Sequence, residues 1–243
     1  MWEDFSFLLL TPTSLIVPIL PRVSLIITID TAVQTASVAL CDERNVLGLK
    51  LNPDQKDHAA WLHPAIQQLL QEQGRTLPEI KAIAVSAGPG SYTGLRVGMS
   101  AAKGLCYALG VPLIELNTLK IMAFAARDAR EDLLCPMIDA RRLEVFTAVY
   151  DAELRQELPP ANMILEPTSF AGLLDTRSIF FFGNGSPKFQ KMLQHPNASF
   201  GALDVNAGNM AILADEEFKN GRFANLAYAE PFYGKGFYTP PVK

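Results

Sequence analysis

The first side chains that could take part in chemistry follow an apolar run near the N-terminal third of the chain. Asp30 and Thr31 come at the end of the β-branched run 24–30, and Thr35 and Ser37 follow a short turn. A carboxylate that ends a strand, with hydroxyls and backbone N–H groups in the next turn, can position the phosphates of ATP together with a metal ion or water. No glycine follows Asp30, however, and the same residues suit a polar β-turn held by its own Asp and Thr side chains. Both interpretations stay open.

A glycine-rich segment, Gly88-Pro89-Gly90-Ser91-Tyr92-Thr93-Gly94, separates an apolar run at 80–86 from a helical pattern that ends near residue 110. Such a loop can present unpaired N–H groups at the positive end of a helix dipole, where anions bind. A P-loop needs Gly-Lys followed by Ser or Thr, but Gly94 is followed by Leu95, and a dinucleotide loop needs glycine where Thr93 stands. The segment is either an anion loop or a tight turn that needs no ligand. The candidate nucleotide or anion residues are Asp30, Thr31, Gly88, Gly90, Ser91 and Thr93.

The predicted helix after this loop has two different faces. Its apolar stripe consists of Leu95, Met99, Ala102, Cys106 and Leu109. A second stripe carries the small residues Gly94, Gly98 and Ala101, although glycine inside a helix costs about 1 kcal/mol relative to alanine. A helix with such a stripe usually gains close approach to another backbone, which is either its own sheet or a helix of another protein chain.

Composition excludes several classes of function. The 243 residues carry a net charge of −4 with no basic tract, so tight binding of nucleic acid by this chain alone is not expected. The three cysteines form no CxxC pair, and the three histidines lack the spacing of a zinc site. The sequence contains no GxSxG elbow, HExxH motif or kinase signature, so we predict no catalytic residue and no metal ligand.

Strand and helix patterns predict an α/β protein of two lobes. Strands are expected at 24–30, 35–41 and 46–51, then helices and strands alternate from 57 to 127, as in parallel crossovers. Further strands at 134–140, 144–151 and 178–182 and helices near 187–194 and 209–220 make the second half a shortened relative of the first. The predicted organisation is an extension at 1–23, a lobe at 24–130, and a shortened lobe with an extended tail at 131–243.

The segment 1–23 is apolar but does not match a signal peptide or membrane anchor. Glu3 and Asp4 stand where a positive region should be, and Pro12, Pro18 and Pro21 interrupt the apolar run. We interpret this segment as a dispensable extension that results from a non-native start.

Four stretches together resemble one protein family. LIITIDTAVQTASVAL (25–40), SAGPGSYTGLRVGMSAAKGL (86–105), VPLIELNTL (111–119) and PMIDARRLEVFTAVY (136–150) are similar to the TsaB (YeaZ-like) family, and EPFY (230–233) is similar to its closing motif. The resemblance covers most of 24–151. It implies an actin-like ATPase (ASKHA) fold of two lobes, each with a mixed sheet flanked by helices.

The family resemblance also implies a function and partners. It implies a non-catalytic cytoplasmic subunit needed for threonylcarbamoyl (t6A) modification of the adenosine next to the anticodon in ANN-decoding tRNAs, where it scaffolds a paralogous TsaD subunit and a TsaE ATPase. It implies no tightly bound cofactor, ATP or ADP only at an interface of the complex, a homodimer when the chain is alone, and contact with tRNA only through the complex. The TsaD relative has an HxxxH metal motif where this chain reads Asn117-Thr118-Leu119-Lys120-Ile121. The alternatives are an active ATPase or phosphotransferase of the same fold and a metallopeptidase-like protein.

By the same resemblance, the helices at 57–73 and 92–109 form the surface that pairs with TsaD or with a second copy. The residues assigned to this interface are Leu62, Ile66, Gly94, Leu95, Gly98, Ala101 and Leu105. We therefore expect Gly98→Trp to block assembly and leave the fold intact.

Overall fold

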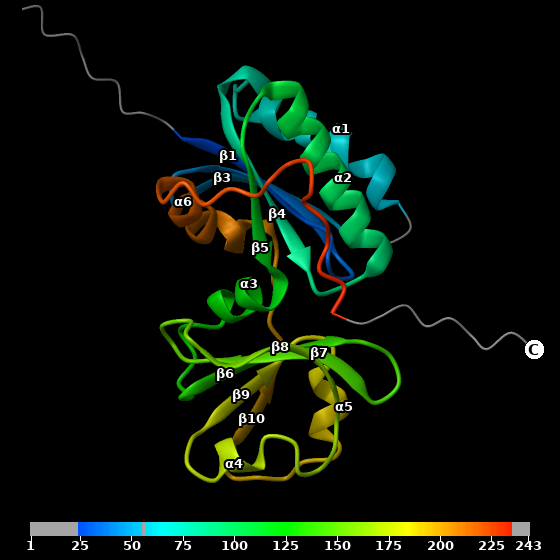
Figure 1. Ribbon diagram of the computed structural model, residues 1–243, viewed down its shortest axis with the longest axis vertical. Coiled ribbons are helices and arrows are strands. Elements are labelled where there is room, and N and C mark those ends of the chain that lie inside the picture. The colour runs from blue at the N-terminus through cyan, green and yellow to red at the C-terminus, as the bar shows by residue number, and fades with distance from the viewer. Residues whose placement is uncertain (1–23, 55–56, 235–243) are drawn as a thin grey trace, which may run out of the picture.

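A computed structural model of the protein describes residues 24–54 and 57–234. The predicted extension at 1–23 and the end of the tail at 235–243 lie outside the described residues. The described chain forms two lobes, each built around a five-stranded sheet (Figure 1). No helix within this part of the chain is long and apolar enough to cross a membrane.

The first sheet has the strand order β3-β2-β1-β4-β5. Its strands are β1 (Leu25–Asp30), β2 (Ala36–Asp42), β3 (Asn45–Asn52), β4 (Ile80–Gly88) and β5 (Leu113–Asn117). The first three strands pair antiparallel, whereas β4 pairs parallel with both β1 and β5. All residues of β1 and all but one of β4 are buried, which explains why these strands are continuous apolar runs without alternation.

The second sheet repeats this topology. Its strands are β6 (Leu133–Asp139), β7 (Glu144–Tyr150), β8 (Gln156–Ile164), β9 (Ile179–Phe182) and β10 (Ala198–Gly201). They lie in the order β8-β7-β6-β9-β10, with antiparallel pairing on the β7 side of β6 and parallel pairing on its β9 side. The two mixed sheets flanked by helices confirm the predicted α/β class and the two-lobe architecture, with a shortened second lobe.

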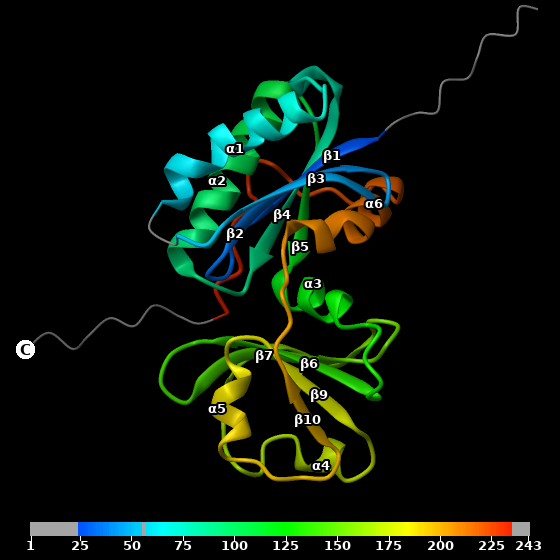
Figure 2. The ribbon, with the colours of Figure 1, turned by 180° about the vertical axis from the view of Figure 1, so that it is seen from behind.

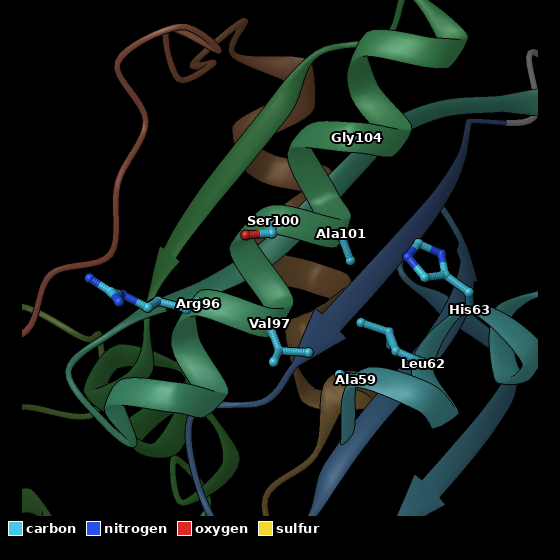
Figure 3. A pocket seen from close by; sticks show the side chains of 8 residues that line it. All are labelled: Ala59, Leu62, His63, Arg96, Val97, Ser100, Ala101 and Gly104. Atoms are coloured by element: carbon cyan, nitrogen blue, oxygen red, sulfur yellow. The ribbon is translucent and has the colours of Figure 1, made fainter. Parts of the chain in front are cut away.

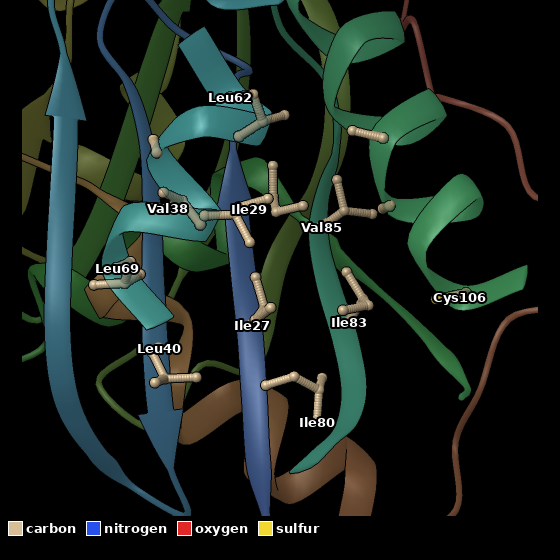
Figure 4. Packing of buried hydrophobic residues seen from close by; sticks show 14 of the residues in the cluster. Ile27, Ile29, Val38, Leu40, Leu62, Leu69, Ile80, Ile83, Val85 and Cys106 are labelled. Carbon is tan, nitrogen blue, oxygen red and sulfur yellow. The ribbon is translucent and has the colours of Figure 1, made fainter. Parts of the chain in front are cut away.

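The helices after the third and fourth strands differ greatly between the lobes. In the first lobe, α1 (His58–Glu72) and α2 (Tyr92–Leu109) cover one face of the sheet. Figure 4 shows Leu62 of α1 near Ile29 of β1 and Cys106 of α2 on the side of β4, in one core with Ile83. The corresponding helices of the second lobe, α4 (Ala171–Leu174) and α5 (Ser186–Gln190), have only four and five residues. α3 (Thr118–Ala125) lies between the two sheets, as both views show (Figures 1 and 2).

The chain returns to the first lobe after β10, which corrects the predicted lobe 131–243. The turn η2 (Ala207–Met210) and α6 (Ala211–Lys219) pack on the face of the first sheet opposite α1 and α2 (Figure 2). Thr28 Oγ1 donates a 2.8 Å hydrogen bond to Ala207 O, and Ala207 N donates one of 2.8 Å to Ser37 Oγ. The second lobe therefore ends before η2.

The C-terminal segment then runs in extended form along α2, on the first lobe (Figure 1). Ala224 pairs with Leu113 of β5, and Lys103 Nζ donates to Ala229 O at 2.8 Å. Phe232 N donates to Ala87 O at 2.7 Å, at the end of β4. Most of the predicted extended tail lies outside the described residues, and its described part, 231–234, packs on the first lobe. A short 3₁₀ turn, η1 (Leu77–Glu79), leads into β4.

Candidate functional site: the Asp30 turn, the glycine loop and the α1–α2 groove

Asp30 ends β1 and is almost fully buried, with 1% of its surface exposed. Its Oδ1 accepts hydrogen bonds from Ala32 N at 3.0 Å and from Ser86 Oγ at 2.7 Å. Burial raises the pKa of the Asp30 carboxyl, and the hydrogen bonds from Ser86 and Ala32 offset this only in part. One oxygen of Asp30 is therefore committed to holding the β1–β2 turn to the end of β4.

The glycine-rich loop closes on the chain's own backbone. A Cβ on Gly90 would lie 2.4 Å from Ala32 O, and a Cβ on Gly94 would lie 2.0 Å from Thr31 O. Gly88 has φ +110°, and a side chain is excluded there too, because its Cβ would lie 2.2 Å from Phe232 O in the C-terminal tail. These glycines allow backbone segments of one chain to approach one another, which is the reason glycine is needed here.

The polar groups of Ser91 in the loop are also used within the chain. Ser91 N donates to Ala32 O at 2.7 Å, and Ser91 Oγ caps α2 by accepting from Gly94 N at 3.3 Å. The Thr31 hydroxyl donates to Gly94 O at 2.7 Å. Among the predicted anion-loop residues, Gly88 and Gly90 thus have a packing role, and Thr93 alone is exposed. The tight-turn interpretation explains the glycines.

A cavity of about 200 Å³ lies between the lobes beside Asp30. Two carboxylates, Asp30 and Asp204, line it together with Thr118 and Asn184, and its described lining contains no lysine or arginine. The Thr118 hydroxyl is buried without a hydrogen-bond partner among the described residues. The walls therefore disfavour a polyphosphate that arrives without a bound cation, because a polyphosphate needs cationic or N–H partners.

The structure places most of the residues assigned to the partner surface inside the first lobe. Six of the seven assigned residues are buried in the first lobe: Leu62, Ile66, Gly94, Leu95, Gly98 and Ala101. Leu105 is half-buried. The small-residue stripe faces the chain's own β1–β2 turn, because a Cβ on Gly98 would lie 2.3 Å from Thr31 Oγ1. Gly98→Trp would therefore disrupt the fold, contrary to our expectation.

The surface that α1 and α2 leave open is a groove between them (Figure 3). It encloses about 430 Å³, and Leu62 and Ala101 form part of its floor. Its complete described lining is Ala59, Leu62, His63, Arg96, Val97, Ser100, Ala101 and Gly104. A Cβ on Gly104 would meet nothing within 4 Å, so this glycine is open to a neighbour. We call these eight residues the α1–α2 groove.

The segment 117–121, where the family resemblance predicts no metal motif, begins with a residue in a structural role. Asn117 caps α3, because its Oδ1 accepts from Leu119 N at 3.0 Å and from Lys120 N at 3.2 Å. Within 24–54 and 57–234, no three His, Cys, Asp or Glu side chains are grouped so as to hold a metal ion.

One cluster, at the N-terminal end of α2, was not predicted from the sequence. His58 of α1 and Arg141 of the β6–β7 turn line a cavity there with Ser91, Thr93 and Gly94. Nothing in the spacing of His58 and Arg141 along the chain indicates that they line one cavity, because they come from different lobes.

Known proteins match this chain over most of its length. The profile of the family described as TsaD, tRNA N6-adenosine threonylcarbamoyltransferase, matches residues 52–228. The tRNA threonylcarbamoyladenosine biosynthesis protein TsaB of Bacillus subtilis is 30% identical over 172 residues, covering 70% of this chain and 75% of that protein. Escherichia coli TsaB is 37% identical over 130 residues, covering 53% and 55%.

A solved structure agrees with these matches. YeaZ from Pseudomonas aeruginosa superposes with a TM-score of 0.76 at 30% identity, covering 86% of this chain and 99% of that one. The agreement in sequence and in fold confirms the predicted resemblance. The chain belongs to the TsaB (YeaZ) family, within the wider group that the TsaD profile describes.

Proposed function

We propose that this chain is a subunit of the machinery that makes threonylcarbamoyladenosine in tRNA, and that it supplies a binding surface instead of an active centre. Membership of the TsaB family supports the pathway. The proposal of a binding surface rests on the α1–α2 groove. This groove is an open surface of mostly apolar and small residues on the longest helices of the described chain. Such a surface suits close packing against helices of a second protein.

The proposed partners are a TsaD-like paralogue and a TsaE-like ATPase, with tRNA reached only through the complex. The α1–α2 groove is the proposed contact with the paralogue, and a second copy of this chain occupies it when the chain is alone. The proposed place of work is the cytoplasm, together with the tRNA.

A non-catalytic role is supported by three features of the cleft. Oδ1 of Asp30 is engaged by Ala32 and Ser86, the glycine loop is closed by Ala32 and the tail, and Asn117 caps a helix where a metal ligand would be needed. We therefore propose that no cofactor binds tightly to this chain, and that ATP or ADP binds only at an interface of the complex. The ATPase and metallopeptidase alternatives are not favoured by the family matches.

Reconstitution tests this function. The chain is mixed with the TsaD and TsaE proteins of its host, the enzyme that forms threonylcarbamoyl-adenylate, threonine, bicarbonate, ATP and unmodified tRNA, and modified adenosine is assayed with and without it. We expect modification only when the chain is present, and no ATP hydrolysis by the chain alone. Equal modification without it would refute the proposal, and ATP turnover by the pure chain would refute its non-catalytic part.

A further inference from the structure

A cavity of about 360 Å³ lies at the N-terminal end of α2 and is lined by both lobes. The first lobe contributes His58, Ser91, Thr93 and Gly94, and the β6–β7 turn of the second lobe contributes Arg141. Ala59 and Val97 complete the described lining. This cavity adjoins the α1–α2 groove, with which it shares Ala59 and Val97, and has no lining residue in common with the acidic cavity beside Asp30.

The end of α2 contributes positive potential to the cavity. α2 has 18 residues, and the free N–H groups of its first turn carry the positive end of the helix dipole. Ser91 Oγ satisfies only the Gly94 N–H. Neither the N–H nor the hydroxyl of Thr93 has a partner within the described residues, so both are available to an acceptor.

His58 provides a second and independent observation. Only 4% of its surface is exposed, its ring is hydrogen-bonded to the Gln34 backbone, and its Nε2 has no partner among the described residues. A buried nitrogen without a partner is uncommon because desolvation without a hydrogen bond costs free energy. A ligand in the cavity would remove this cost.

Arg141 brings a positive charge to the opposite wall. It has φ +70° in the β6–β7 turn, which is held by a 2.6 Å hydrogen bond from Arg141 N to Asp139 Oδ1. Its guanidinium forms no ion pair with a described carboxylate. The charge therefore faces the cavity region without a neutralising partner within ion-pair distance.

We propose that this cavity binds the phosphate group of a small ligand, with the Thr93 N–H and hydroxyl, the Arg141 guanidinium and a protonated His58 as donors. Phosphate is the anion that suits donors arriving from several directions, including a helix N-terminus and an arginine. Because the donors come from both lobes, the bound phosphate links them. The inference rests on this cavity alone and does not depend on the proposed function.

The proposal predicts that binding is coupled to protonation of His58. Burial lowers the pKa of His58, although the charges of Asp54, Asp30 and Asp57 act in the opposite direction, so the free ring is neutral near pH 7. A bound anion adds a negative charge next to the ring and raises this pKa. The charged groups around the ring are therefore these three carboxylates and, across the cavity, Arg141. Affinity should increase as the pH falls through the neutral range.

The test uses the full chain and follows its histidine rings by NMR during titration with sulfate, whose charge does not change in this pH range. We expect a saturable shift of the His58 signals toward the imidazolium form, stronger at about pH 6 than at about pH 8, with exposed His63 unchanged. Arg141→Ala should weaken binding about tenfold. Arg142→Ala is the matched control, since Arg142 lies in the same turn at φ +51° but does not line the cavity.

Equal losses in the Arg141→Ala and Arg142→Ala proteins, or no saturable shift, would overturn the proposal. Titrations with inorganic phosphate, AMP and adenosine distinguish the sources of the group. Binding of inorganic phosphate supports a site for the free ion. Tighter binding of AMP than of phosphate supports a site for the phosphate group of a nucleotide. Binding of adenosine as tight as that of AMP would overturn it.

Discussion

In the first lobe, the helix after the glycine-rich loop has 18 residues, whereas its counterpart in the second lobe has five. The helices one step earlier, α1 and α4, have 15 and four residues. Both sheets have the same strand order, so the lobes differ in what lies on the sheet. The short helices α4 and α5 cover a core, whereas α1 and α2 also form the α1–α2 groove. Within the described residues, the first lobe alone carries long helices on the face that holds this groove.

The two lobes also differ in the surroundings of the acid that ends their first strand. β1 ends in Ile29-Asp30 and β6 ends in Ile138-Asp139. Asp30 is buried and its pKa is raised by that burial. Partial burial also acts to raise the pKa of Asp139, but hydrogen bonds from Lys188 and the Arg141 backbone lower it overall. The acid of the first lobe is a packing residue, and that of the second is a surface residue in an ion pair.

Substituting one closed and one open glycine should show the largest difference between the lobes. Gly94→Ala places a Cβ 2.0 Å from Thr31 O, so the α2 helix or the β1–β2 turn must move, and we expect a loss of about 2–4 kcal/mol in the free energy of unfolding. Urea titration measures it. Gly172→Ala in α4 is the control, because its Cβ would meet nothing within 4 Å and should change stability by no more than about 1 kcal/mol. Similar changes in the two proteins would contradict this description of α2.

The two acids should give pH dependences of opposite sign. The folded-state pKa of Asp30 is raised, so its contribution to stability is complete below its ordinary pKa of 3.8 and is lost as the pH rises. Asp30→Asn should therefore gain stability relative to the wild type with increasing pH. The folded-state pKa of Asp139 is lowered, so its contribution is present above 3.8 and is lost in acid. Asp139→Asn should lose stability relative to the wild type at neutral pH and converge with it in acid.

Urea titrations between about pH 3.5 and about pH 8 check both variants. The expected Asp139 effect is small, because exposed ion pairs contribute little. For each variant, the difference in the free energy of unfolding from the wild type is plotted against pH. If the two plots slope in the same direction, the pKa values of Asp30 and Asp139 are not shifted in opposite directions as described.

The smallest effect on stability is expected at Gly104. Its side of α2 is exposed and a Cβ would meet nothing within 4 Å, so Gly104→Trp should change the free energy of unfolding by less than about 1 kcal/mol. Thermal and urea unfolding measure this change. A large loss of stability would mean that the α1–α2 groove is not open as described.

The sequence was sufficient to predict the first sheet, α1 and α2, because their apolar runs and helical periodicity are long. It was insufficient for β8, whose Pro159 and Pro160 argue against a strand. β8 lies at the edge of its sheet, where proline is tolerated because an N–H is not always needed there. β10 has four residues and was missed for lack of length.

The candidate sites were harder to predict, because they depend on which segments meet. A stripe of small residues shows that some backbone comes close to α2, but Gly98 alone cannot reveal that the neighbour is Thr31 of the same chain. The return of α6 to the first sheet and the approach of Arg141 to α2 are contacts between distant parts of the sequence. Local patterns carry no information on them.

The most direct test of the central claim, that the chain provides a surface and not an active centre, is the yield of modified adenosine in the reconstituted system with three variants. Gly104→Trp fills the α1–α2 groove, Gly172→Trp makes the same change on the second lobe, and Asp30→Asn removes the charge of the cleft acid. We predict that Gly104→Trp abolishes modification, whereas Gly172→Trp and Asp30→Asn proteins remain as active as the wild type. Loss of modification with folded Asp30→Asn protein, together with full activity of Gly104→Trp, would contradict the account.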